Sequence, residues 1–128
     1  MNNVQNIVIG NLNINSIPLK FDQLKQFIVG NIDILVLVET KLDDTFPLSQ
    51  FYIEGYSRPY RLDRNKHGGG ILIYVKENIS SKCLKIHSVL YDIEALFIEL
   101  NFRKSKWLLT GIYHPPSQND QYFFDNLD

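Results

Sequence analysis

Two predicted strands with a helix between them open the chain. Segment 6–14 alternates polar and apolar side chains and is rich in β-branched residues, which predicts a strand. Ser16-Ile17-Pro18 then interrupts the pattern with residues typical of a helix start, and the apolar positions that follow have helical spacing up to Gly30, the expected C-terminal cap of a helix of roughly three turns. Segment 33–38 is apolar on both faces, as in a strand covered on both sides. These patterns predict a β-α-β unit.

The remainder of the chain is typical of a long connection followed by strands. Gly55, Pro59 and the charged stretch 61–67 indicate a surface loop or short irregular strands. Alternating side chains then predict strands at 71–75, 84–88, 93–100 and 107–113, with a hairpin connection at 101–105.

After Pro115-Pro116, Ser117 and Asp120 have the spacing of a capping box, and an amphipathic helix is expected to begin there and to be cut short by the chain end. The sequence has no repeat, low-complexity tract or linker, so residues 1–128 are interpreted as one domain.

Composition and charge narrow the class of protein. With 128 residues, 45% apolar and 21% charged, the chain can bury one core and is not expected to be disordered. No apolar run exceeds five residues and no secretory signal precedes the first strand, so we expect an intracellular protein without membrane contact. A net charge of −1 gives no broad footprint for nucleic acid, and any phosphate binding must be local. The single cysteine, Cys83, excludes an internal disulfide.

A carboxylate stands directly after the apolar strand 33–38. Three asparagines, Asn11, Asn13 and Asn15, alternate at the end of the first strand and point to one side. Ligand sites in open α/β sheets lie outside the carboxyl ends of the strands, and Mg²⁺ prefers carboxylate oxygens with water and phosphate, so Glu39 suits a metal ligand if the two strands are parallel neighbours. Alternatively, Glu39 caps a turn and the asparagines satisfy loop backbone.

Other polar motifs are less specific. The run His67 to Gly70 is similar to the oxyanion loop of esterases, but the chain has no Gly-x-Ser-x-Gly, so the glycines are expected to allow a tight entry into strand 71–75. Walker and dinucleotide-binding spacings are absent. Cys83 and His87 lie in a strand pattern without a second pair of ligands, which argues against zinc.

Two further groups of side chains are candidates for substrate contact. Arg61 and Arg64 belong to a charged cluster that is either a solvated loop or a contact to nucleic-acid phosphates. Tyr113 and His114 follow a strand, so both could share the rim of Glu39, although a buried-edge tyrosine is commoner than a catalytic one.

The order of these motifs resembles the endonuclease/exonuclease/phosphatase superfamily, in particular the apurinic-type endonuclease domain of LINE-type non-LTR retrotransposons. The matching segments run in family order across nearly the whole chain: 12–16 (LNINS), 33–40 (DILVLVET), 55–56 (GY), 61–64 (RLDR), 68–75 (GGGILIYV) and 111–116 (GIYHPP). The resemblance implies an α/β fold, the N-terminal portion of a four-layer α/β/β/α sandwich. It also implies Mg²⁺-dependent hydrolysis of DNA phosphodiesters, with Mn²⁺ as an alternative ion, in a nuclear parent protein that carries a reverse transcriptase domain in cis.

The resemblance also implies roles for individual residues. Glu39 matches the metal-binding glutamate, and Asn13 matches the amide that helps to hold metal or phosphate. Asn15 lies near the same site, and Tyr113 matches the tyrosine that contacts the scissile phosphate. Together with the charged loop and the end of the last strand considered above, this gives Asn15, Arg61, Arg64 and His114 as the expected substrate contacts.

The chain departs from the family pattern at its end. It ends at Asp128, before the family's Gly-Asp-x-Asn motif, which orients the attacking water, and before its C-terminal Asp-His pair. We therefore expect a partial domain that is almost inactive alone, since acid-base groups contribute about 10²- to 10⁴-fold each. We also expect poor solubility, because the missing strands would leave apolar sheet edges and faces uncovered. Two alternatives stay open: a non-catalytic remnant that binds nucleic acid or a protein, and a phosphatase-type member acting on lipid or sugar phosphates. The sequence does not indicate an oligomeric state.

Overall fold

The computed structural model describes residues 6–90 and 93–113, without the side chains of 85–90. The predicted capping box at Ser117 and the helix after it lie outside these residues. The elements in chain order are β1 (Ile9–Asn13), α1 (Phe21–Ile28), β2 (Ile34–Val38), the short 3-10 helix η1 (Leu48–Phe51), β3 (Tyr60–Leu62), β4 (Ile71–Val75), β5 (Ser80–Leu90), β6 (Ile93–Phe102) and β7 (Ser105–Tyr113).

The predicted β-α-β unit is confirmed. Strands β1 and β2 are parallel neighbours, with Ile9 opposite Ile34 and Asn13 opposite Val38. Helix α1 is shorter than predicted, because the backbone before it is tied to the segment after β2: the Ile17 N–H donates to the Thr40 carbonyl at 3.1 Å. Beyond the helix, Gly30 has a φ of +83°, a conformation that glycine adopts without strain.

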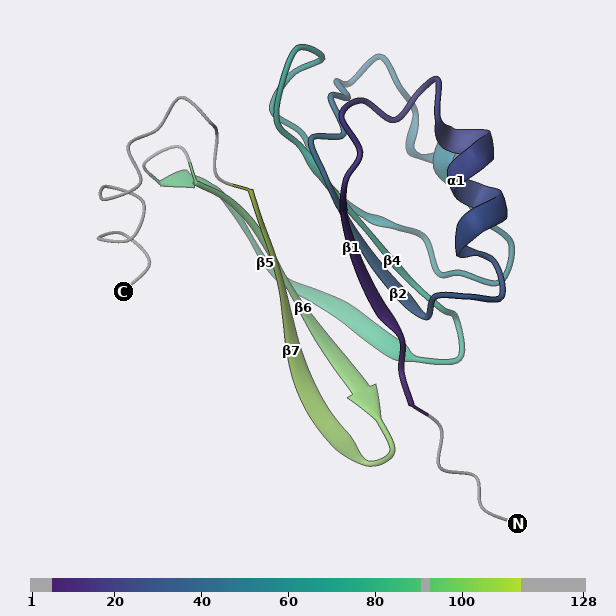
Figure 1. Cartoon of the computed structure of the whole chain (residues 1–128). Coiled ribbons are helices and arrows are strands. Elements are labelled where there is room, and N and C mark those ends of the chain that lie inside the picture. Colours follow the sequence, from purple (N-terminus) through teal and green to yellow (C-terminus); the bar gives the residue numbers. More distant parts are fainter. Residues whose placement is uncertain (1–5, 91–92, 114–128) are drawn as a thin grey trace.

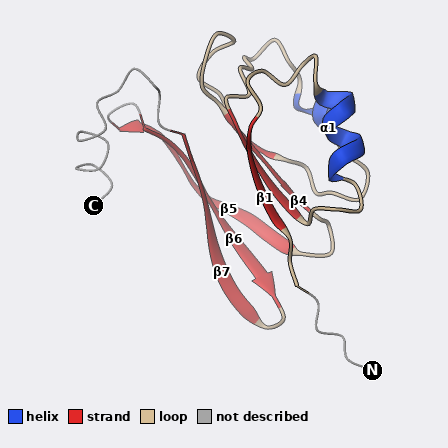
Figure 2. Cartoon of the chain, viewed as in Figure 1, coloured by secondary structure: helices blue, strands red, loops and turns tan. Residues whose placement is uncertain are grey.

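In the described part of the chain, the two sheets and helix α1 make three layers (Figures 1 and 2). The first sheet has the order β1-β2-β4-β3 and the second the order β5-β6-β7. Strand β2 is apolar on both faces because each face meets a different core. Leu35 and Leu37 pack toward α1 and the loops, while Ile34 and Val36 pack toward the second sheet. The described residues therefore form a partial α/β sandwich, in agreement with the expected fold class.

The long connection is only partly irregular. Residues 60–62 pair with β4 as β3, and η1 buries Phe51 against the helix layer. The predicted hairpin is confirmed, with Arg103 and Lys104 at φ values of +54° and +66°, as a two-residue turn of the primed type requires. Strands β5 and β7 begin earlier than predicted because the polar residues at their starts are held by backbone pairing to β6.

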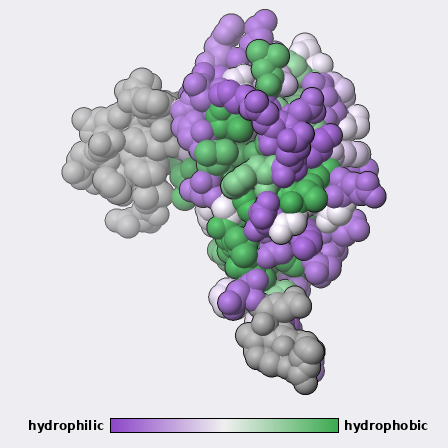
Figure 3. Space-filling view, turned by 45° about the vertical axis from the view of Figure 1, so that its right-hand side comes forward, coloured by the Kyte–Doolittle hydropathy of each residue, from purple (hydrophilic) through white to green (hydrophobic). Residues whose placement is uncertain are grey.

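Apolar side chains remain exposed at the edge strands. Strand β1 ends the first sheet and β7 ends the second, and hydrophobic side chains reach the surface among hydrophilic ones (Figure 3). The exposed large apolar residues on these two strands are Ile9, Leu12, Trp107, Leu108 and Ile112. No helix in the described part of the chain is long and apolar enough to cross a membrane.

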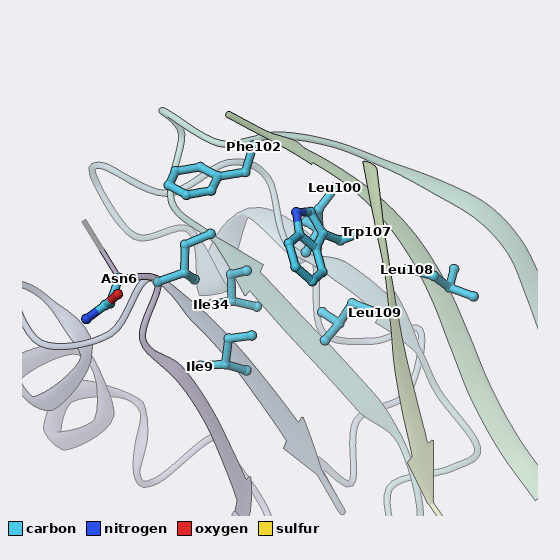
Figure 4. A pocket seen from close by; sticks show the side chains of 9 residues that line it. Asn6, Ile9, Ile34, Leu100, Phe102, Trp107, Leu108 and Leu109 are labelled. Carbon is cyan, nitrogen blue, oxygen red and sulfur yellow. The ribbon is translucent and has the colours of Figure 1, made fainter. Parts of the chain in front are cut away.

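An apolar cavity of about 380 Å³ lies between the start of β1 and the β6–β7 hairpin. Its wall includes Ile9, Ile34, Phe102 and Trp107, and no charged side chain lines it (Figure 4). Because Ile9 and Ile34 are the first residues of their strands, the cavity lies at the opposite end of the first sheet from Glu39.

Candidate functional site

The polar residues singled out in the sequence come together at one end of the first sheet. Asn13 and Val38 are paired as the last residues of β1 and β2, and Val38 is also opposite Ile71, the first residue of β4. From the second sheet, Tyr113 ends β7 and is paired with Glu94 near the start of β6. Strand ends from both sheets therefore define this rim.

Asn13 holds the carboxylate of Glu39. The Asn13 Nδ2 group donates a hydrogen bond to Glu39 Oε2 at 2.7 Å. Glu39 is the first residue after β2 and has a φ of +57°, the left-handed region that costs a non-glycine residue about 1–2 kcal/mol. Such strain is characteristic of functional sites. The predicted closeness of Asn13 and Glu39 is thus observed.

Asn15 and Lys41 extend this network. The Asn13 Oδ1 atom accepts from the Asn15 N–H at 3.1 Å, and Asn15 Oδ1 accepts from Lys41 Nζ at 2.6 Å. The same ammonium lies 4.0 Å from Glu39 Oε1. Sequence reasoning missed Lys41. Its position two residues after Glu39 was the available signal, but the left-handed backbone at both residues brings the two side chains together.

Tyr113 approaches the same carboxylate from the second sheet. Its hydroxyl hydrogen bonds to Glu39, and burial followed by the negative charge of Glu39 raises the pKa of Tyr113 to about 12. The phenol therefore stays protonated at neutral pH and acts as a hydrogen-bond donor. The positive charge of Arg64 lowers the pKa of the same group, and Arg64 lies 3.5 Å from Glu94, the residue opposite Tyr113.

The glycine run joins the rim to a buried acid. Gly68 and Asn65 exchange backbone hydrogen bonds in a tight turn that leads into β4, as predicted. The Gly70 N–H donates to Glu94 Oε1 at 2.7 Å, and Glu94 Oε2 lies 3.5 Å from Arg64 Nε. Burial raises the pKa of Glu94. Sequence reasoning missed Glu94 because it occupies an ordinary position in an alternating strand.

Arg61, one of the predicted substrate contacts, bonds to a loop and not to this network. Arg61 donates to the Asp63 carboxylate and to the carbonyl oxygens of Asp43 and Phe46, so its guanidinium holds the 43–63 loop together. Its role in substrate binding stays a prediction. His114 lies outside the described residues.

Among the described residues of this network, Glu39 is the side chain that suits a hard divalent cation. No group of three or more His, Cys, Asp or Glu side chains gathers in the described chain. Mg²⁺ commonly binds through a carboxylate or two and keeps waters and substrate phosphates, which Glu39 at an exposed rim can accommodate. Asn13 was also expected to be a ligand, but its oxygen accepts the Asn15 N–H while its nitrogen faces Glu39. In this arrangement Asn13 orients the Glu39 carboxylate, and its expected role as a metal ligand stays a prediction.

Comparisons with known proteins give the fold. No protein-family profile matches the chain, and no curated protein matches it. Similar solved structures include the 3′ phosphatase NExo from Neisseria bound to product DNA hairpin, with 20% identity, a TM-score of 0.55, and coverage of 80% of this chain and 40% of that one. TDP2 from D. rerio, complexed with single-strand DNA product, has 14% identity, a TM-score of 0.63, and coverage of 94% and 51%. An AP endonuclease from Archaeoglobus fulgidus has 20% identity, a TM-score of 0.53, and coverage of 80% and 40%.

The chain therefore spans about two fifths to one half of the length of these structures. At such low identities the likeness establishes the shared fold, that of the DNA-processing enzymes named above.

Proposed function

We propose that this chain is the N-terminal portion of a divalent-metal-dependent DNA endonuclease of the endonuclease/exonuclease/phosphatase type, carried by a LINE-type retrotransposon. The observation that carries the proposal is the rim where Asn13 holds the Glu39 carboxylate and Tyr113 meets it from the second sheet. The DNA-bound and DNA-processing enzymes that share the fold support DNA as the substrate class.

The residues at the rim suit phosphodiester hydrolysis. Glu39 would hold Mg²⁺, or Mn²⁺ in its place, and the bound ion would supply a Lewis acid for a phosphoryl oxygen. Asn13 keeps the carboxylate in place. Tyr113 stays protonated, and its single hydroxyl proton, which Glu39 accepts in this structure, would be donated to a phosphate oxygen once Glu39 holds the ion. Arg64 adds a positive charge on the same rim.

We propose that the chain alone does not cleave DNA. Catalysis by the family is implied to need a water-orienting Asp and a general-base His, and the Gly-Asp-x-Asn motif does not occur in this sequence. The parent protein would supply both groups, would include a reverse transcriptase domain, and would act in the nucleus. Translation of the coding sequence beyond Asp128 should give Gly-Asp-x-Asn, and an unrelated continuation would remove the endonuclease assignment.

Paramagnetic broadening by Mn²⁺ tests the metal site in the chain as it exists. With a short DNA duplex present, Mn²⁺ should broaden the NMR amide signals of Asn13, Glu39 and Tyr113, and Glu39→Gln should abolish this. Glu77→Gln is the matched control, since Glu77 follows β4 at the opposite end of the sheet and should leave the broadening unchanged. Equal broadening in Glu39→Gln would remove Glu39 from the metal site.

A second candidate function is metal-free nucleic-acid binding by a non-catalytic module. It is favoured by Lys41, whose ammonium lies 4.0 Å from Glu39 Oε1 and partly neutralises the carboxylate without a metal ion. This candidate predicts salt-sensitive DNA binding in EDTA that Mg²⁺ does not strengthen. The endonuclease proposal predicts that Mg²⁺ strengthens binding in the wild-type chain and not in Glu39→Gln.

A further inference from the structure

Glu94 is an acidic side chain buried between the two sheets. It is 2% exposed and sits on β6 opposite Tyr113 of β7. A buried charge is costly unless it is paired and hydrogen-bonded. Glu94 has no part in the proposed metal site, and its burial depends on the groups that pair with it.

The backbone of the glycine run shapes the space around Glu94. The Gly70 N–H donates to Oε1 at 2.7 Å, and a Cβ atom at Gly69 would come within 2.5 Å of Oε2. A Cβ atom at Gly68 would likewise lie 2.5 Å from Arg64 Nη2. The absence of side chains at Gly68 and Gly69 therefore leaves room for the carboxylate and the guanidinium to meet.

The second carboxylate oxygen of Glu94, Oε2, faces Arg64. Oε2 is buried and accepts no hydrogen bond within the described residues, and its charged neighbour is Arg64 Nε at 3.5 Å. The Arg64 side chain is 37% exposed, so the guanidinium reaches from the buried acid to the surface. A guanidinium has five donors in a rigid fork, and pairing through Nε leaves the Nη groups available for another anion.

We infer that Glu94 is a positioning residue that fixes the Arg64 guanidinium beside Tyr113, so that Arg64 and Tyr113 form a subsite for a backbone phosphate of DNA. This inference rests on the proposed function. The 3.5 Å contact of Arg64 Nε with Glu94 Oε2 and the cross-strand pairing of Glu94 with Tyr113 put all three groups at one place. Arginine forks bind phosphate bidentately, which makes the orientation of the guanidinium as important as its charge.

A double-mutant cycle on DNA affinity tests the inference. Fluorescence anisotropy with a labelled DNA hairpin in EDTA, over a range of salt concentrations, is measured for wild type, Glu94→Gln, Arg64→Gln and the double variant. Arg64→Gln should weaken binding about tenfold and lower the slope of log K against log salt by about 0.9. Glu94→Gln should weaken binding about fivefold in the wild type and by less than about twofold in the Arg64→Gln background.

If Glu94 acted only through its charge, Glu94→Gln would change the DNA affinity in the opposite direction. Removal of a negative charge near a phosphate would strengthen binding, so unchanged or tighter binding by Glu94→Gln overturns the inference. Equal weakening by Glu94→Gln in both backgrounds overturns it too, since a general structural role is independent of Arg64. Arg58→Gln is the matched control: Arg58 lies near the far end of β4, and loss of its charge should change affinity by less than about twofold.

The DNA affinity of Arg64→Lys and the NMR signal of the Arg64 Nε–H group provide two further tests. If Glu94→Gln does not fold, Arg64→Lys retains the charge but removes the Nε donor, and wild-type affinity in that variant overturns the inference. The Nε–H NMR signal of Arg64 should shift in Glu94→Gln, and an unchanged signal also counts against the pairing. Failure of the cycle with normal Mn²⁺ broadening at Glu39 refutes the subsite alone, whereas a wild-type chain that binds no DNA in EDTA and none in Mg²⁺ refutes the subsite together with the proposed function.

Discussion

Replacement of Gly70 by alanine should damage the rim by two separable effects. Gly70 has a φ of +102°, and a Cβ atom there would lie 2.2 Å from Thr40 Oγ1. Thr40 is fully buried, so its side chain is enclosed by neighbouring groups. Alanine at this position is therefore strained in its backbone and in collision with a neighbour.

The two contributions can be estimated from the structure. Left-handed backbone costs a non-glycine residue about 1–2 kcal/mol. Overpacking of a buried site costs about 1–3 kcal/mol more. Gly70→Ala should thus lower the free energy of unfolding by about 2–5 kcal/mol. Gly55→Ala isolates the first effect, because Gly55 has a φ of +91° and a Cβ atom there would meet nothing within 4 Å. Its cost should be about 1–2 kcal/mol.

Urea unfolding of the variants, followed by circular dichroism, measures these differences. Thr40→Ala removes the colliding hydroxyl, which has no hydrogen-bond partner in the described structure. The double variant Thr40→Ala/Gly70→Ala should therefore recover about 1–3 kcal/mol relative to the sum of the single effects. Additive costs, or equal costs of Gly70→Ala and Gly55→Ala, would refute the proposed contact between Gly70 and Thr40.

Three further predictions concern titration and packing. Burial raises the pKa of Glu94 in the folded chain above its unfolded value near 4.5, so the folded state binds more protons than the unfolded state. The stability of the wild type should therefore fall as pH rises from about 4.5 through that raised pKa. Urea unfolding at several pH values should show Glu94→Gln gaining stability relative to wild type across this window, and a constant difference would contradict the prediction. Glu39→Gln should lower the pKa of Tyr113 from about 12, measured by ¹³C NMR of the ring, and an unmoved pKa would mean that Glu39 does not contact the phenol. Leu72→Ala, at a fully buried position, should cost about 2–5 kcal/mol of unfolding free energy, whereas Leu108→Ala, 62% exposed, should cost within about 0.5 kcal/mol; similar costs would place Leu108 in the core.

The local sequence pattern was sufficient to predict the secondary-structure elements and the contact between Asn13 and Glu39. The unbroken apolar run of β2 predicted a strand between two layers, and those layers supply separate cores on its two faces. Because parallel neighbours end at the same edge, the sequence also predicted that Asn13 and Glu39 meet, and they are hydrogen-bonded. The start of α1 was less accurate, since a hydrogen bond from Ile17 to Thr40 competes with helix formation.

The partners of the rim residues followed from contacts that are distant in sequence. Nothing in the alternation of β6 marked Glu94, because its burial depends on the packing of the second sheet against the first. The difference between Arg61, whose guanidinium binds loop carbonyls, and Arg64, which pairs with Glu94, was equally invisible in the charged stretch.

The sequence by itself determined the strands, the β-α-β unit and the common edge of Asn13 and Glu39, because these depend on periodicity and on the geometry of neighbouring strands. Only the tertiary structure decided that Tyr113 reaches Glu39 and that Glu94 holds Arg64, because both contacts join a residue of the second sheet to a loop residue at the end of the first sheet. Side chains from two layers meet only after the core between them has fixed the distance and rotation of the sheets.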